Sequence, residues 1–92
     1  MERYNDRKID EFGRIILEGT LREHLGIEEG DKIALTVMDS IVVVQRADDG
    51  DCVVDELGRI TIPADIQQKM SWAAKNEVAV YHTDSLLILK TA

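Results

Sequence analysis

A repeat with a period of 45 residues is the feature that most constrains how this chain can fold. Residues 9–47 align without a gap on residues 54–92 when the sequence is shifted by 45 positions. The motif DEFGRI at residues 10–15 falls on DELGRI at residues 55–60, with five of the six positions identical. The chain therefore contains two copies of one unit. They are joined by a connector at residues 48–53 that begins with the sequence DDGD.

The length allows one compact domain, because a chain of 92 residues usually buries a single core. With 45% hydrophobic and 32% charged residues, the composition is that of a globular protein. One copy of about 40 residues is too small to bury its own apolar strands. We therefore predict that residues 1–92 form a single domain, in which the copies pack together about an internal pseudo-two-fold axis.

Each copy is predicted to contain a glycine turn, a strand, a short helix and a hairpin. Glycine in the repeated motif indicates tight turns at 10–14 and 55–59, which we call the first and the second turn. Thr20 is expected to cap a helix that ends at Gly26, and Pro63 to begin the second helix. Segments rich in Val, Ile and Leu predict hairpin strands at 32–37, 41–45, 77–82 and 86–90. The run at 41–44 is apolar on both faces, which predicts cover from both sides.

The charge balance limits the partners that this chain can bind. A net charge of -7 repels nucleic-acid phosphates at long range, so any DNA binding depends on local basic clusters. Residues 1–22 hold five basic and five acidic side chains, and the rest of the chain is acidic. The charge thus favours a protein-interaction module, such as an antitoxin-like or regulatory subunit that binds a basic partner.

The sequence indicates neither an active site nor a metal site. The adjacent carboxylates of the repeated motif lie near no nucleophile and no Gly-rich phosphate loop, and no Cys/His cluster has zinc-ligand spacing. His24 and His82 fall at different repeat positions and are assigned to surface or helix-end positions. The lone Cys52 cannot form an internal disulfide. We therefore expect a cytoplasmic protein without enzymatic activity, cofactor, metal or membrane span.

The repeated motif, the strand, the short helix and the closing hairpin together resemble the AbrB/SpoVT/MazE-like swapped-hairpin family of small DNA-binding regulators. The resemblance covers nearly the whole chain, twice. It implies a mainly β fold with two short helices, in which the hairpins interleave into a swapped-hairpin β-barrel. It also implies a transcriptional regulator that contacts double-stranded DNA. Further association into a homo-oligomer and binding of a protein partner are left open.

The resemblance assigns DNA contacts to five basic side chains: Arg7, Lys8, Arg14, Arg22 and Arg59. An arginine beside a glycine turn can contact a phosphate or a guanine edge, or it can pair with the motif aspartate to hold the turn. The second copy retains only Arg59, since the other matching positions are Cys52, Val53, Gln67 and Gln68. The first copy is therefore expected to supply most contacts, and loss of Arg59 to matter less than loss of Arg14.

Overall fold

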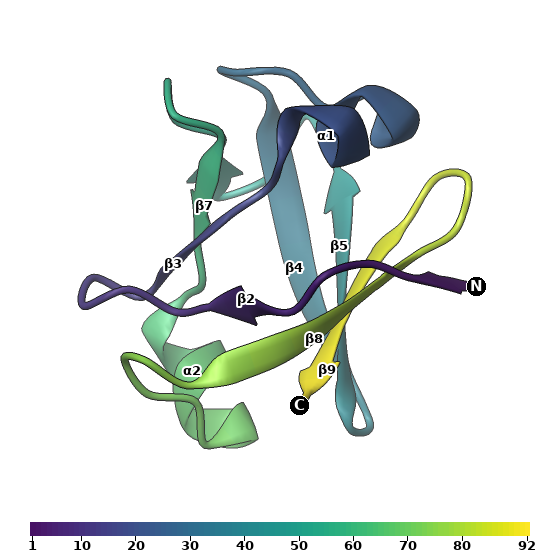
Figure 1. Cartoon of the computed structure of the whole chain (residues 1–92). Helices are drawn as coiled ribbons and strands as arrows, with labels where there is room; N and C mark the ends of the chain where they lie inside the picture. Colours follow the sequence, from purple (N-terminus) through teal and green to yellow (C-terminus); the bar gives the residue numbers. More distant parts are fainter.

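The computed structural model describes all residues from 1 to 92, which form a mainly β fold with two short helices (Figure 1). The elements up to the connector are β1 (Glu2–Arg3), β2 (Arg7–Lys8), β3 (Arg14–Ile16), α1 (Gly19–Leu25), β4 (Lys32–Met38) and β5 (Ile41–Arg46). The remaining elements are β6 (Cys52–Val53), β7 (Arg59–Thr61), α2 (Ala64–Met70), β8 (Glu77–His82) and β9 (Leu87–Thr91). A shift of 45 residues carries β2, β3, α1, β4 and β5 onto β6, β7, α2, β8 and β9 to within one residue at either end.

The strands form two antiparallel sheets. The larger sheet has the order β1-β8-β9-β5-β4-β6, with β2 also paired to β8. The smaller sheet consists of β3 and β7 alone. Hydrogen bonds do not close the larger sheet on itself, because β1 and β2 form one edge of it, both paired to β8, and β6 forms the other.

Two strand pairings join the copies through equivalent residues. Ile15 lies opposite Ile60 in the β3–β7 pair, and Val43 lies opposite Ile88 in the β5–β9 pair. The two residues of each pair are one repeat apart, so they occupy equivalent positions in the two copies. Each of these two strand pairs is therefore symmetric: exchanging the copies gives the same pairing. The outer pairings are reciprocal as well. The strand β2, which leads into the first copy, pairs with β8 of the second copy, and β6, which leads into the second copy, pairs with β4 of the first.

The two helices lie at opposite ends of the molecule in Figure 1. The helix α1 begins after Glu18 without a side-chain cap, so the prediction that Thr20 caps it is wrong. The Thr20 hydroxyl lies instead 2.9 Å from the hydroxyl of Tyr4. Gly26 ends α1 in the left-handed conformation, with a φ of 69°, as predicted. Neither helix is long and apolar enough to cross a membrane.

Both copies contribute to a single core of 17 buried residues. At its centre, where β5 pairs with β9, the fully buried side chains are Val42, Val44, Leu87 and Leu89. Trp72 lies in the same core and its Nε1 donates a hydrogen bond to Oγ1 of Thr91, 3.1 Å away. The core therefore belongs to neither copy alone.

The opposite face of β5 is covered less completely than the sequence predicts. Ile41 and Val43 are only half-buried, whereas Val42 and Val44 are fully buried. The expectation of cover on both faces of this strand is therefore confirmed for one face and only in part for the other, where Ile88, opposite Val43, is buried but Val43 itself is not fully so.

Substitution of Ile60 tests how much the β3–β7 pairing, which connects the two copies, stabilises the fold. We expect Ile60→Ala to lower the free energy of unfolding by about 2–5 kcal/mol, because it leaves a cavity where β3 meets β7. The milder Ile60→Val should cost about 0.5–1.5 kcal/mol. The matched control is Ile16→Ala on the outer face of the same sheet, where the side chain is 48% exposed and the loss should be about 0.5 kcal/mol. Urea denaturation followed by circular dichroism measures all three, and equal losses at Ile16 and Ile60 would contradict this role.

Candidate nucleic-acid interface

The outer face of the β3–β7 sheet carries both turn arginines. Side chains alternate along a strand, and the central isoleucines of β3 and β7 point into the core. Arg14 lies opposite Thr61, and Arg59 lies opposite Ile16, on the other face of the sheet. Arg14 and Arg59 are thus diagonal neighbours across the two strands, and residues so placed in an antiparallel pair lie about 7–8 Å apart. The structure brings these two predicted residues together on one surface.

A single carboxylate holds both the backbone and the arginine of the first turn. Oδ1 of Asp10 accepts hydrogen bonds from the backbone N–H groups of Phe12 and Arg14, both at 2.9 Å. Oδ2 of Asp10 accepts a hydrogen bond from Nε of Arg14 at 2.8 Å. Gly13 completes the turn with a φ of +78°, a conformation that glycine adopts without strain. The Nη atoms of Arg14 have no hydrogen-bond partner in the protein.

The second turn repeats these hydrogen bonds, although Leu57 stands where the first turn has Phe12, whose ring centre lies 4.9 Å from Cζ of Arg14. Oδ1 of Asp55 accepts from the backbone N–H groups of Leu57 and Arg59, and Oδ2 accepts from Nε of Arg59 at 2.7 Å. The Arg59 side chain is 24% exposed, and its Nη atoms also lack a partner in the protein. The pairing with aspartate, which the sequence offered as the alternative to ligand contact, is therefore present. It uses Nε only, so it leaves Nη available for a ligand.

Both aspartates favour the ionised form. Burial raises the pKa of Asp10, but the hydrogen bonds from Arg14 and Phe12 outweigh it and hold that pKa below its usual value. The backbone N–H of Arg59 is the main cause that lowers the pKa of Asp55, and burial opposes it only in part. The carboxylates that orient the two guanidinium groups are therefore charged at neutral pH.

The second turn packs against α1. A Cβ built on Gly58 would lie 2.9 Å from Nε and 3.1 Å from Cζ of Arg22. Nε of Arg22 donates a hydrogen bond to the carbonyl oxygen of Leu17 at 2.9 Å, which holds the side chain against the turn. No protein atom accepts a hydrogen bond from Nη of Arg22. Arg22 of the first copy therefore lies beside the turn that carries Arg59.

The first turn packs against α2 in the same way. A Cβ built on Gly13 would collide with the side-chain amide of Gln67. Nε2 of Gln67 donates a hydrogen bond to the carbonyl oxygen of Ile62 at 2.8 Å. The residue beside the turn that carries Arg14 is therefore a neutral amide and not a second arginine.

The remaining two predicted residues lie on β2. Nη1 of Arg7 forms an ion pair with Oε1 of Glu18 at 3.0 Å, and its Nε donates to the carbonyl oxygen of Asp6. Lys8 is exposed and has no ion-pair partner, although it faces Glu77 across the β2–β8 pair. Arg7 is thus occupied within the protein, whereas the Lys8 ammonium is free.

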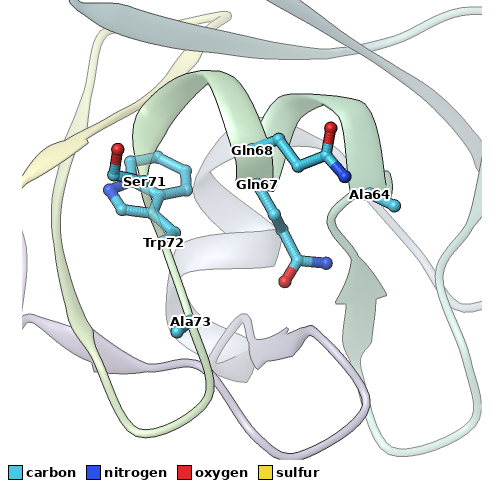
Figure 2. Close-up of a pocket in the computed structure, with 6 residues that line it drawn as sticks. All are labelled: Ala64, Gln67, Gln68, Ser71, Trp72 and Ala73. Carbon is cyan, nitrogen blue, oxygen red and sulfur yellow. The ribbon is translucent and has the colours of Figure 1, made fainter.

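Hollows with equivalent linings lie beside the two helices. The one beside α2, of about 450 Å³, is lined by Ala64, Gln67, Gln68, Ser71, Trp72 and Ala73 (Figure 2). The one beside α1, of about 320 Å³, is lined by the repeat-equivalent residues Gly19, Arg22, Glu23, Gly26, Ile27 and Glu28. Figure 2 shows Gln67 and Gln68 leaving α2 in different directions. The copies therefore share a shape here but differ in charge.

The structure also brings together two histidines that the repeat alignment separates. The rings of His24 and His82 are 4.7 Å apart in an edge-on contact, and Nε2 of His82 lies 3.7 Å from Oε2 of Glu2. His82 is only 7% exposed, so its assignment to the surface or to a helix end is wrong. The contact joins α1 of the first copy to β8 of the second, and alignment of equivalent positions cannot reveal such a contact.

No protein family, curated protein or solved structure matched the chain. The role of the β3–β7 face must therefore be inferred from its own chemistry.

The lowered pKa values of Asp10 and Asp55 predict sensitivity to acid. A carboxylate whose pKa is lower in the folded state stabilises the fold fully above its unfolded pKa, about 3.9. This contribution is lost as the pH falls through the lower, folded-state pKa. We expect the wild type to lose stability below about pH 4 more steeply than the double variant Asp10→Asn/Asp55→Asn, in which Oδ1 can still accept the backbone hydrogen bonds.

Urea denaturation at a series of pH values measures this difference. The matched control is Asp48→Asn/Asp49→Asn, which removes two carboxylates from the exposed connector and should leave the wild-type pH dependence unchanged. If the free energy of unfolding falls with pH equally in the Asp10/Asp55 double variant and the wild type, these two carboxylates do not cause the loss of stability in acid.

Proposed function

We propose that this chain is a DNA-binding transcriptional regulator of the AbrB-like type, and that it binds duplex DNA through the outer face of the β3–β7 sheet. The observation that carries the proposal is the pair of arginines on that face. Asp10 and Asp55 accept hydrogen bonds from Nε of Arg14 and Arg59, which leaves the Nη atoms without a hydrogen-bond acceptor in the protein. The Arg14 guanidinium also lies over the Phe12 ring, with Cζ 4.9 Å from the ring centre. A guanidinium held in this way is ordered before it meets a phosphate or the O6 and N7 atoms of guanine, so little side-chain freedom is lost on binding.

The proposed architecture is a swapped-hairpin β-barrel with an internal pseudo-two-fold axis. In such a barrel, strands of one copy complete the sheet of the other. The reciprocal pairings of β2 with β8 and of β6 with β4 support this exchange. The self-equivalent registers of β3–β7 and β5–β9 support the two-fold relation. The smaller sheet would close the wall that the larger sheet leaves open.

Binding by this face depends on short-range contacts. The net charge of -7 gives no long-range attraction to DNA, so affinity must come from Arg14, Arg59 and Arg22, to which the exposed Lys8 on β2 can add. Arg7 contributes less directly, because it is paired with Glu18. Such binding weakens steeply with salt, since each phosphate contact releases condensed counterions.

A protein-interaction module is the second candidate, and a specific observation favours it. Phe12 and Leu57, at equivalent positions on the two turn tips, are 67% and 63% exposed. Aromatic side chains and arginines are enriched in the centre of protein interfaces, and Phe12 lies beside Arg14. A basic partner would also be attracted by the acidic surface.

Fluorescence anisotropy with a labelled duplex of random sequence, over a salt series, separates the two candidates. We expect binding at low salt, and we expect Arg14→Ala or Arg59→Ala to reduce the salt slope by about one unit. The control Lys90→Ala removes a cation from β9, in the other sheet, and should leave the slope unchanged. If the wild type does not bind at low salt, the protein-interaction candidate is favoured. If Lys90→Ala matches the arginine variants, the β3–β7 face is not the binding surface.

A further inference from the structure

We infer that the proposed DNA-binding face consists of two unequal half-sites, each built from the turn of one copy and the helix of the other. The strong half-site contains Arg59 and Arg22. The weak half-site contains Arg14 and Gln67. This inference rests on the proposed function, and it names the residues that act together within it.

Backbone hydrogen bonds connect the two parts of the strong half-site. The N–H of Leu17 donates to the carbonyl oxygen of Gly58 at 2.9 Å, and the carbonyl oxygen of Leu17 accepts from Nε of Arg22 at 2.9 Å. Gly58 directly precedes Arg59. Leu17, which directly follows β3, thus connects the turn of the second copy to the helix of the first. The positions of Arg22 and Arg59 therefore depend on each other.

The weak half-site has the same connections with a different side chain. The N–H of Ile62 donates to the carbonyl oxygen of Gly13 at 2.8 Å, and its carbonyl oxygen accepts from Nε2 of Gln67 at 2.8 Å. Gly13 directly precedes Arg14. Because the two frameworks are equivalent, an arginine at position 67 would have the room that Arg22 occupies beside Gly58.

Because each turn lies beside the helix of the other copy, the arginine expected to contribute most to DNA binding changes. If each copy acted alone, the first would hold Arg14 and Arg22, and the second only Arg59. In the structure the Arg22 guanidinium lies beside Gly58, which directly precedes Arg59, so Arg59 should matter at least as much as Arg14, contrary to the expectation from the sequence. The guanidinium groups of Arg59 and Arg22 suit phosphates or guanine edges, although Glu23 and Glu28 line the same hollow as Arg22 and repel phosphate. An amide such as Gln67 or the exposed Gln68 suits adenine. One chain would therefore bind an asymmetric DNA site in one orientation.

Double variants test which residues act together. We expect Arg22→Ala and Arg59→Ala to be coupled, so that the affinity loss of the double variant is smaller than the product of the single losses by about tenfold. The losses from Arg22→Ala and Arg14→Ala should multiply to within about twofold, as for independent sites. The readout is anisotropy of a labelled random-sequence duplex longer than the 28 Å extent of the molecule. Circular dichroism checks that each variant is folded.

A gain of binding avoids the risk that an arginine variant loosens its turn. We expect Gln67→Arg to complete the weak half-site, raise the affinity and add about one unit to the salt slope. The matched control is Gln45→Arg, which adds the same charge at an exposed position of β5. An equal gain from both variants would show that only net charge matters and would overturn the half-site assignment.

The outcomes distinguish this inference from the function on which it rests. If Arg22 is coupled to Arg14 and independent of Arg59, half-sites built from the turn of one copy and the helix of the other are ruled out. The proposal of DNA binding would be unaffected by that result. Failure of the wild type to bind the duplex at low salt would overturn the proposed function and the inference together.

Discussion

The pairing of β5 with β9 is the interaction on which the rest of the structure depends. It joins the hairpins of both copies in one sheet, and it places Val42, Val44, Leu87 and Leu89 in the centre of the core. Burial of each such side chain contributes about 1.5–3 kcal/mol, which neither copy could obtain alone. Buried side chains of both helices and of the β3–β7 sheet belong to the same core. The surface that carries the turn arginines thus exists only because the copies associate.

Within that framework, each turn is a local and nearly self-sufficient unit. Asp10 and Asp55 use one carboxylate oxygen for the backbone and the other for the arginine at the end of the turn. The shape of the turn and the direction of the guanidinium are therefore coupled, and both depend on an ionised carboxylate. This explains why the aspartate, the glycine and the arginine recur together at the same spacing in both copies.

The sequence predicted the elements well where short-range forces define them. The turns, the left-handed glycine at Gly26 and the hairpin strands lie within a residue or two of their expected positions. Predictions failed where a distant partner changes the outcome. Thr20 does not cap α1, because the helix begins one residue before it, at Gly19, and its hydroxyl contacts Tyr4 of the segment between β1 and β2. His82 is buried because α1 of the other copy covers it with His24.

The sequence by itself determined the repeat, the order of the elements and the anchoring of Arg14 and Arg59, because these depend on contacts between residues four positions apart in the chain. Only the tertiary structure decided that Arg22 belongs beside Arg59, and that Gln67 belongs beside Arg14. These neighbours come from different copies, and the partner of each helix follows from how the strands pair across the molecule. A pattern of residues along the chain cannot specify that choice, because both copies carry the same local signals and either turn would fit either helix.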